Sequence, residues 1–573
     1  MRVELQQGHM AHALLDDAAF IADWSHLLAC CGHATAFQAP AFTRAWYRTY
    51  HQTWDPVIVL ARDGFGRLGA LWLLAYDARA SRLTHAGAHQ AEYQVWICGP
   101  ALQDEFIAAA WTLLTQRLRF RTLTIKYLPS LDCVRTLQRV AVTAPVVEVT
   151  AHSRPLIRLD RQSIDTSFAK KSNKSRFNRL KKLGRLDFLL VERSEQMETV
   201  LDDFCAQYDF RQGAVNHAVP FFDDPLKRAF QRELFISAPA QECCVSATLL
   251  DDKLIAGFWG MRSGRMVHLG MLAHSPMLAE HSPGKLHIMQ LSRSLAGSGT
   301  EVLDLTPGGD PWKERFANDH DEVASAVLYR HPWQRRANAL CDRLLKQAKQ
   351  VAAKVDISPD QLRGFVAKLR RARPAALARR FAHWVGDQRE FRIYRADRAL
   401  AQSFTRDARV RCNAIDELVA FVPGERWQSR DTFLASALER IERGEAAYSV
   451  RLEGRLAHCG WMVRGQTESR ISEVEQVMHF PSGTVALYDF YSHPDFRGRG
   501  LYRATLGHML QEVFAASETQ WAYISVLADN GPSRHVIESM GFAYQGSFHY
   551  RRRFATTRKW ADSAVASMEP GDG

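Results

Sequence analysis

The 573-residue sequence lacks the cysteine spacings that hold metals or carry redox chemistry. Its ten cysteines include two adjacent pairs but no C-x-x-C, which argues against a zinc ribbon, an iron–sulfur site or a dithiol redox centre. No window approaches the roughly 18 apolar residues of a membrane span, and the first residues carry charge where a signal peptide needs an apolar stretch. We therefore expect a cytoplasmic protein without a metal.

Acidic residues are fewer than basic ones, and the difference is concentrated in one segment. The chain has 74 Lys and Arg against 62 Asp and Glu, a formal net charge of +12. Residues 331–386 hold thirteen of the basic residues and three of the acidic ones, so this segment alone accounts for +10. Its apolar residues recur at helical spacing, which predicts a basic helical connector. The connector either packs between domains, the interpretation we favour, or lies on an anionic membrane.

Runs typical of strands alternate with runs typical of helices on both sides of this connector. The length suggests three or four domain-sized units, and the alternation predicts an α/β (α+β) fold of mixed β-sheets flanked by helices. The predicted segments are 1–150 and 151–330, paired in tandem, then the connector, a further unit over 387–556 and a disordered tail over 557–573.

The strongest chemical signal is a glycine-bearing turn between a strand and a helix. The strand-like run TVALYDFY leads through a proline turn to Arg497-Gly498-Arg499-Gly500-Leu501-Tyr502, where an amphipathic helix begins. Glycines at such a junction leave backbone N–H groups exposed and convergent, and the helix N-terminus adds the positive end of its dipole. The turn therefore predicts a site for a pyrophosphate, with Arg497 and Arg499 supplying charge.

This stretch resembles the acyl-CoA loop of the GNAT acyltransferase superfamily. The loop pattern Q/R-x-x-G-x-G/A corresponds to Arg497, Gly500 and the position of Tyr502, and the run Asn530-Gly531-Pro532-Ser533 with Gly541-Phe542 is similar to the superfamily's following helix. The resemblance covers about 391 to 555 and implies acetyl-CoA or another acyl-CoA as co-substrate. The residues that it assigns to this co-substrate are Tyr491, Arg497, Gly498, Arg499, Gly500, Leu501, Tyr502, Asn530 and Ser533.

Two positions depart from the superfamily's pattern. Tyr502 stands where the loop usually ends in a small residue, and Ile537 stands where many members have a tyrosine that protonates the leaving thiolate. The transfer also needs a base for the attacking amine or hydroxyl. Asp489 and His493 are the acidic and imidazole groups nearest to the strand, and they are the predicted catalytic residues. In the alternative, Asp489 faces solvent and His493 is only a turn residue.

A second resemblance covers about residues 35 to 330. The basic run KKSNKSRFNRLKKL from Lys170, the Ser282-Pro283-Gly284 helix start and the run DLTPGGDPWKERF from Asp304 are similar to the CelD-like branch of the FemAB-type acyltransferases. Proteins of this type have two GNAT-like units in tandem. The resemblance therefore implies three GNAT-like units in the whole chain, two paired and one appended.

Three groups of residues in this half are candidates for contact with a ligand. Gly284 and Lys285 at the helix start are placed to meet a phosphate. The basic run over 170–185 is either a solvated helix face or a cradle for an anionic acceptor or cofactor. The candidates for substrate binding are Asp304, Asp310, Lys313 and Arg315, which alternatively pair with one another in a structural network.

These patterns predict an acyl-CoA-dependent N- or O-acyltransferase, expected to be an acetyltransferase, that transfers the acyl group directly from the thioester to an amine or hydroxyl. The family context favours a small-molecule or saccharide acceptor, as in exopolysaccharide or cellulose synthesis. No metal is required, because the tasks are positioning, proton removal and polarisation of the thioester carbonyl. The alternatives are FemAB-type transfer from charged tRNA, the one nucleic acid expected as a partner, and a non-catalytic acyl-CoA-binding or scaffold protein.

Overall fold

The computed structural model describes residues 2–141, 146–239, 242–337, 340, 387–424, 428–553 and 556–566. The chain divides into two compact units, which we call N-terminal (Met1–Tyr208 with Asp223–Gln350) and C-terminal (Asp209–Phe222 with Val351–Gly573). Of the connector predicted over 331–386, residues 338–339 and 341–386 lie outside the described residues, while 332–337 are helical. Residues 567–573 of the predicted tail also lie outside them.

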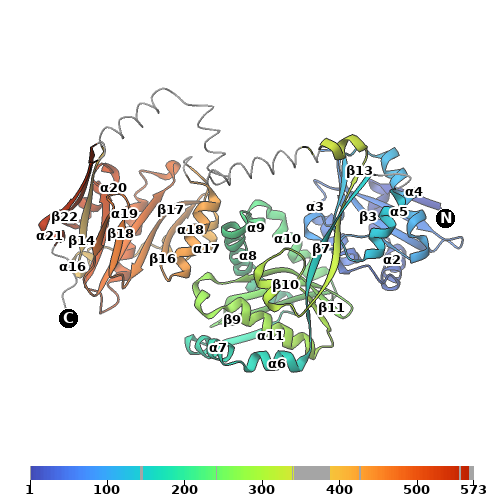
Figure 1. Cartoon of the computed structure of the whole chain (residues 1–573), viewed down its shortest axis with the longest axis horizontal. Helices are drawn as coiled ribbons and strands as arrows, with labels where there is room; N and C mark the ends of the chain where they lie inside the picture. The colour runs from blue at the N-terminus through green and yellow to red at the C-terminus, as the bar shows by residue number, and fades with distance from the viewer. Residues whose placement is uncertain are drawn as a thin grey trace. The chain divides into compact units, whose positions relative to one another are not determined.

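One mixed sheet runs through the N-terminal unit (Figure 1). Thirteen strands of its described residues take part, and short β5 (Ile97–Cys98) pairs with β3 beside the main path. In spatial order the path is β1 (Arg2–Gln7), β2 (Asp55–Arg62), β3 (Leu68–Asp77), β4 (Arg82–His85), β6 (Thr122–Leu128), β13 (Asp319–Tyr329), β7 (Val146–Arg158), β12 (Val302–Asp304), β11 (Met266–His274), β10 (Lys253–Ser263), β9 (Cys243–Leu250) and β8 (Leu186–Leu190).

Strand β13 returns from the end of this unit into its first half. It pairs antiparallel with β7, from Asp319 opposite Leu156 to Tyr329 opposite Val146, and with β6 on its other side. The boundary predicted at residue 150 therefore falls inside β7, and the two predicted halves share one sheet, in which Figure 1 shows β7 and β13 running side by side.

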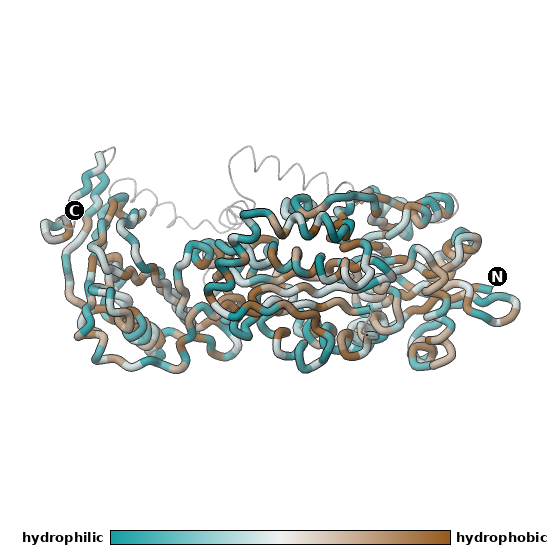
Figure 2. The backbone as a smooth tube through the Cα atoms, turned by 90° about the horizontal axis from the view of Figure 1, so that it is seen from below, coloured by the Kyte–Doolittle hydropathy of each residue, from teal (hydrophilic) through white to brown (hydrophobic). Residues whose placement is uncertain are grey.

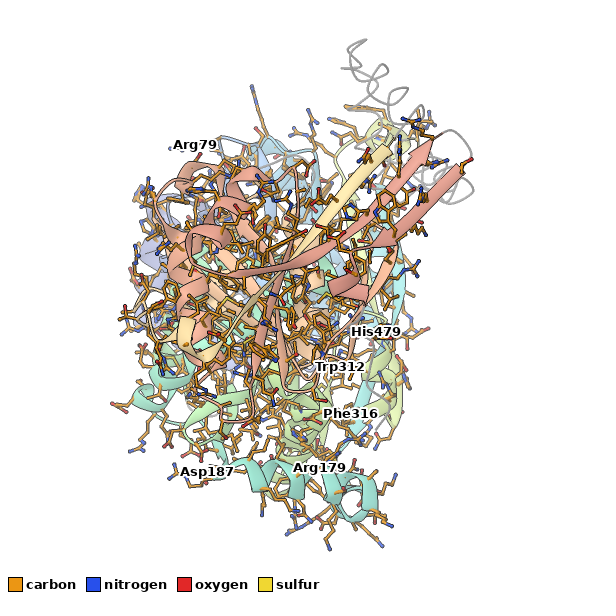
Figure 3. The ribbon with its side chains drawn as sticks, turned by 90° about the vertical axis from the view of Figure 1, so that its left-hand side faces the viewer. Arg79, Arg179, Asp187, Trp312, Phe316 and His479 are labelled. Atoms are coloured by element: carbon orange, nitrogen blue, oxygen red, sulfur yellow. The ribbon has the colours of Figure 1, made fainter. Side chains whose placement is uncertain are left out.

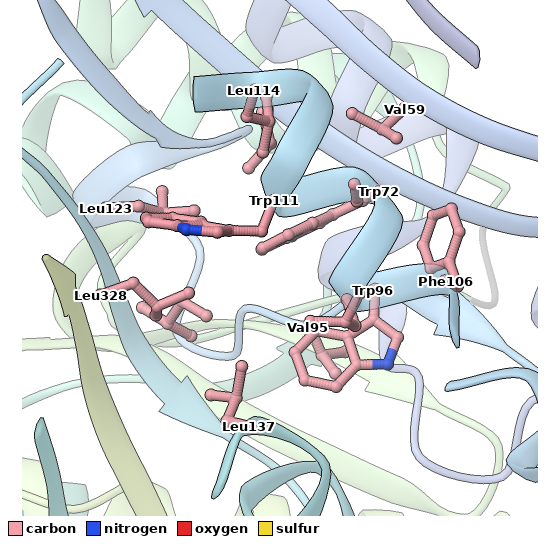
Figure 4. Close-up of a cluster of buried hydrophobic side chains, with 14 of the residues drawn as sticks. Val59, Trp72, Val95, Trp96, Phe106, Trp111, Leu114, Leu123, Leu137 and Leu328 are labelled. Atoms are coloured by element: carbon pink, nitrogen blue, oxygen red, sulfur yellow. The ribbon is translucent and has the colours of Figure 1, made fainter. Parts of the chain in front are cut away.

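Helices cover the faces of this sheet and bury a core rich in tryptophan. Figure 4 shows Trp72 of β3, Trp96 and the α4 residues Phe106 and Trp111 packed in one cluster, in which Trp72 and Trp96 are fully buried. Burial of a large apolar side chain stabilises the fold by about 1.5 to 3 kcal/mol. The helices are α1 (His9–Asp16), α2 (Ala18–Cys30), α3 (Pro40–Tyr50), α4 (Gln103–Arg117), α5 (Leu131–Val140), α6 (Arg161–Ala169), α7 (Lys171–Leu183), α8 (Ser194–Asn216), α9 (Pro220–Asp223), α10 (Pro225–Ser237), α11 (Pro283–Gly297) and α12 (Pro311–Phe316), with the short turn η1 (Ala36–Gln38).

The C-terminal unit has its own mixed sheet of eight strands among the described residues. Figure 2 shows brown hydrophobic stretches alternating with teal hydrophilic ones along the backbone. The spatial order is β15 (Arg411–Cys412), β16 (Ala446–Leu452), β17 (Arg455–Arg464), β20 (Thr484–Ser492), β21 (Trp521–Leu527), β14 (Asp387–Ala396), β22 (Ala543–Arg553) and β23 (Thr556–Ala561), and β18 (Glu468–Ile471) pairs separately with β19 (Gln476–His479). The helices are α16 (Arg398–Ala401), α17 (Ile415–Val419), α18 (Arg430–Glu442), α19 (Leu501–Val513), α20 (Gly531–Ser539) and α21 (Ser563–Ala566), with the turn η5 (Pro494–Phe496).

The start of the predicted disordered tail is ordered, which corrects the expectation for residues 557–566. Strand β23 pairs antiparallel with β22, from Phe548 opposite Ala561 to Arg553 opposite Thr556. Val565 of α21 is buried in the same cluster as Ile393 and Phe548. The strand pairing and this apolar contact supply the order that the polar composition of the tail did not predict.

Candidate active site

The glycine turn predicted to hold a pyrophosphate leads from β20 through η5 into α19. Gly498 and Gly500 have φ angles of 75° and 72°, and Gly500 is the residue that precedes the helix. These angles favour glycine, and a Cβ atom added at either position would meet nothing within 4 Å. The first N–H groups of a helix have no acceptor within it. The turn therefore presents backbone donors toward open space, as an anion site requires.

Charged side chains brace this turn from the hairpin between β16 and β17. Arg499 Nη1 lies 3.4 Å from Glu453 Oε1, and its guanidinium lies 5.0 Å from the Phe496 ring centre. Arg455 lies 4.8 Å from the same ring and donates to Asp495 Oδ2 at 2.8 Å. Because Arg499 remains about half exposed (51%), its charge stays available to a ligand. Arg497 donates through Nε to the Ser492 carbonyl at 3.3 Å.

Strands β20 and β21 separate beside this turn. They pair in parallel from Thr484 opposite Trp521 to Leu487 opposite Ile524, whereas β20 continues to Ser492 with β17 on its other side. Asp489, with φ of 50°, lies in an irregularity opposite Gly460. Such bulges bend a strand away from its neighbour. The bend opens the sheet next to the first turn of α19.

Aromatic side chains line the same region. Tyr502 lies in the first turn of α19, with its ring centre 4.7 Å from that of Phe490 and 5.6 Å from that of His458. Its hydroxyl lies 3.1 Å from Ser533 Oγ of α20. Burial raises the pKa of Tyr502 to about 12, so the phenol stays protonated at neutral pH. Ile537 is fully buried in the core and has no hydroxyl to offer.

The two predicted bases already have protein partners. Asp489 Oδ2 forms an ion pair with Arg440 Nη1 of α18 at 2.6 Å, and its side chain is 57% exposed. His493 is buried, and its Nδ1 accepts the Asp495 N–H at 3.2 Å. A neutral imidazole that accepts at Nδ1 carries its hydrogen on Nε2. It then has no second ring nitrogen free to accept a proton. The geometry therefore gives His493 the turn role that was its alternative, and it gives Asp489 an ion pair.

The remaining residues assigned to the co-substrate lie around the same turn. Asn530 Oδ1 accepts the Ser533 N–H at 3.3 Å and so caps α20. Leu501 is buried in the core, and the ring centre of Tyr491 lies 5.2 Å from that of Phe421. Asn530 and Leu501 thus shape the site through the two helix starts.

The helix start at Gly284 in the N-terminal unit lies among cations from three elements. Burial lowers the pKa of Lys285, and the charges of Arg176, Lys170 and Arg315 lower it further. Helix α7 contains no acidic residue, and Figure 3 labels one of its basic side chains, Arg179. A Cβ at Gly284 would approach His274 Nδ1 to 3.0 Å, so close packing explains this glycine. The convergence of positive charge fits an anionic ligand.

Lys313 and Arg315, predicted to bind substrate, bond to their own loop and helix. Lys313 is buried and donates from Nζ to the carbonyls of Thr306 at 3.1 Å and Pro307 at 3.3 Å, with Asp310 Oδ2 at 3.4 Å. Arg315 donates to the Pro311 carbonyl at 3.3 Å. These contacts match the structural alternative for Lys313 and Asp310.

Asp304 lies in a different network, fully buried at the end of β12. Its Oδ2 accepts from the Tyr93 hydroxyl at 2.6 Å and from His268 Nδ1 at 2.8 Å, with Arg154 Nη1 at 3.6 Å. Its partners are therefore not the lysine and arginine of its own run. Sequence reasoning missed Tyr93, Arg154 and His268, because Tyr93 is 211 residues from Asp304 and no local pattern joins them.

His287, fully buried on α11, makes the N-terminal unit sensitive to acid. Its nitrogens bond to Ser246 Oγ at 3.0 Å and Thr248 Oγ1 at 2.8 Å. Burial lowers its pKa to about 3, with a smaller contribution from His274. Because the unfolded state takes up this proton below about pH 6.5, stability falls as pH decreases. We expect this histidine to cost about 1.5 kcal/mol of unfolding free energy between pH 6.5 and 5.

Urea unfolding of the wild type and of His287→Gln at several pH values measures this effect. The variant is expected to lose less stability than the wild type over the same interval. Equal losses in the two proteins would contradict the assignment.

Within the described residues, no group of three or more His, Cys, Asp or Glu side chains is arranged to hold a metal ion. A search of the helices in the same ranges finds none that combines the length and the apolar character of a membrane span.

Comparison with known proteins gives two family matches. A model described as acetyltransferase (GNAT) domain matches residues 167–314, and a model described as acetyltransferase (GNAT) family matches residues 413–542. The protein carries two GNAT domains. The first domain runs from the end of α6 to α12. The second contains the glycine turn and helix α20. The GNAT domains support an acyltransferase in general terms.

Several solved structures are similar to parts of the chain. FemX is 8% identical over 55% of this chain and 97% of its own, with a TM-score of 0.38. L-PGS from Bacillus licheniformis is 12% identical over 57% and 96%, with a TM-score of 0.34. A tandem GNAT protein from the clavulanic acid biosynthesis pathway is 13% identical over 65% and 100%, with a TM-score of 0.21. At such low scores they say nothing about the chemistry of this chain. No curated protein matches the sequence.

Proposed function

We propose that the protein is an acyl-CoA-dependent N- or O-acyltransferase whose C-terminal GNAT domain binds acetyl-CoA or another acyl-CoA at the turn before α19. The observation that carries this is the pair of left-handed glycines, Gly498 and Gly500, which open a helix start toward free space beside the separation of β20 and β21. In this proposal the pyrophosphate contacts the first N–H groups of α19 and Arg499. The thioester lies toward the gap, by which we mean the space where β20 and β21 separate.

The aromatic residues of the gap have roles in the same proposal. An acceptor amine or hydroxyl attacks the thioester carbonyl directly, and the carbon–sulfur bond breaks. Tyr502 is the proposed donor to the leaving thiolate, because its phenol is protonated and lies against α20 where Ile537 cannot serve. Asp489, held by Arg440, is proposed to accept the acceptor's proton only when that ion pair opens. A saccharide or other small molecule in the cytoplasm is the proposed acceptor.

Titration calorimetry with acetyl-CoA tests the binding step. Gly500→Trp forces a side chain into the left-handed region and onto the open face of the turn, so we expect at least about tenfold weaker binding than wild type. Gly465→Trp is the matched control, because Gly465 also has a positive φ of 66° and open surroundings but lies in the turn after β17. We expect it to bind like the wild type.

A wild type that shows no heat with acetyl-CoA or with longer acyl-CoAs would contradict the proposal. Binding without release of free thiol over a broad panel of amines and alcohols would favour the non-catalytic binding protein instead.

A second candidate, transfer from charged tRNA, is supported by the basic surface of the N-terminal unit. Lys170, Arg176, Lys285 and Arg315 converge there, and α7 has no acidic residue. Phosphate contacts of this kind weaken steeply with salt. Turnover with charged tRNA and none with acyl-CoA would favour this candidate.

A further inference from the structure

A serine, a histidine and an aspartate form a continuous hydrogen-bonded relay in the N-terminal unit. Ser263 is the last residue of β10, His268 lies on β11, and Asp304 is the last residue of β12. Asp304 Oδ2 lies 2.8 Å from His268 Nδ1, and His268 Nε2 lies 3.0 Å from Ser263 Oγ. A nucleophile, a base and an orienting carboxylate within these distances are the signature of an activated hydroxyl.

The partners of Asp304 place a hydrogen on the nitrogen of His268 that faces it. Burial raises the pKa of Asp304, but the hydrogen bond and charge of His268, the charge of Arg154 and the Tyr93 hydroxyl together lower it further than burial raises it. The carboxylate is therefore ionised and can only accept, so His268 carries hydrogen on Nδ1. In the neutral form of His268, Nε2 accepts and the Ser263 hydroxyl donates to it, whereas the protonated form donates from both nitrogens.

Burial decreases along the relay toward the serine. Asp304 is fully buried and His268 is 2% exposed, whereas Ser263 is half-buried. The next residue, Gly264, has open space around it, since an added Cβ would meet nothing within 4 Å. The N–H of Ala36 donates to Ser263 Oγ at 2.8 Å and holds the hydroxyl in place. The serine end of the relay is therefore its least buried part.

The packing around His268 keeps the base in one orientation. Its ring centre lies 5.1 Å from that of Tyr93 and 5.9 Å from that of Phe37, and both of these residues come from the first half of the unit. Arg154 balances the buried carboxylate and also pairs with Asp321. The relay therefore lies in the second half of the N-terminal unit and is supported by side chains from the first half.

We propose that Ser263 is the nucleophile of an acyl-transfer centre that acts on activated acyl groups, esters or thioesters, through an acyl-serine. Ser263 Oγ bonds to the acyl carbon while its proton passes to His268 Nε2. The bond from that carbon to sulfur or oxygen breaks, and the leaving thiol or alcohol takes the proton from His268. Water, an amine or an alcohol then reverses these steps, giving its proton to His268, and Ser263 recovers its own. This centre does not depend on acyl-CoA binding in the C-terminal GNAT domain.

Labelling of the full chain with a fluorophosphonate tests this proposal. The reagent forms a covalent bond to an activated serine and releases fluoride, and it requires no acyl-CoA. We expect intact-mass analysis to show one adduct on the wild type, and peptide mapping to place it on Ser263. Ser263→Ala should abolish the adduct, and His268→Gln should slow its formation by about 100-fold or more, the usual contribution of a general base.

Ser298→Ala is the control, because Ser298 is an exposed serine of this unit whose hydroxyl donates to the Leu295 carbonyl at 2.9 Å and has no histidine partner in the bonds of the described residues. It should label like the wild type. Melting curves of the variants show whether each is folded, and the mapped position in the wild type is independent of them. No adduct on the wild type, or an adduct on any residue other than Ser263, would overturn the proposal, whatever the calorimetry with acetyl-CoA gives.

Discussion

Replacing Asp304 with alanine is expected to lower the free energy of unfolding of the N-terminal unit by about 3 to 5 kcal/mol. The carboxylate is fully buried and accepts from Tyr93, His268 and the Thr306 N–H, the last at 2.7 Å. Its removal leaves these donors without an acceptor and leaves Arg154, only 8% exposed, with less compensation for its charge.

Urea unfolding of the full chain, followed by fluorescence of the buried tryptophans, measures this loss. Asp319→Ala is the matched control, because Asp319 pairs with Arg158 at 2.6 Å on the same sheet but is exposed. We expect the control to unfold like the wild type, since surface ion pairs add little stability. A variant at Asp304 as stable as this control would mean that the network does not hold the unit together.

The stabilisation by Asp304 also has a defined pH dependence. Because its pKa is lower in the folded protein than in the unfolded chain, its contribution is complete above the unfolded value of about 4 and is lost as pH falls through the folded value. The acid loss due to His287 begins at higher pH, near 6.5, so the two effects separate along the pH axis.

Replacing Gly260 with alanine is expected to destabilise the same unit by about 3 kcal/mol, although only one methyl group is added. A Cβ at this position would overlap the carbonyl oxygen of His268 on β11 and approach the Phe258 ring to 2.7 Å. The strand pairing shifts register at Trp259 and Gly260, which brings the backbones together there. A backbone atom cannot move aside as a side chain can, so β10 or β11 must shift.

Gly297→Ala provides the control for this experiment. Gly297 ends α11, and an added Cβ meets nothing within 4 Å. We expect it to be neutral or slightly stabilising, because alanine reduces the freedom of the unfolded chain. Equal unfolding midpoints for the two variants would show that β10 and β11 accommodate the methyl group.

The glycine turn could be predicted from the sequence because its requirements are local. Gly498 and Gly500 need left-handed angles, and a helix follows directly, so neighbouring residues carry the whole pattern. The orientation of His493 could not be predicted in this way. The role of His493 depends on whether its ring faces its own turn or the gap. The hydrogen bond from the Asp495 N–H holds the ring toward the turn.

The relay of the N-terminal unit could not be predicted from the sequence, for a different reason. In the sequence, Asp304 is a candidate only together with the residues that follow it in the run DLTPGGDPWKERF. The residues that contact it in the structure are determined by the order of strands in the sheet. Arg154 meets Asp304 because β12 lies between β7 and β11, and Ala36 meets Ser263 because η1 packs near β10. Such long-range contacts come from topology, which spacing alone does not encode.

The late return of β13 has a consequence for how the unit is made. Strands β6 and β7 do not pair with each other but each with β13, so both expose open edges until Asp319–Tyr329 has been synthesised. Unpaired edges are prone to join other chains, and distant pairings slow folding. The first 150 residues therefore cannot complete their sheet while the ribosome is still producing the second half. A fragment that ends at the predicted boundary, or at the end of the first GNAT match, would expose unpaired strand edges and is expected to aggregate.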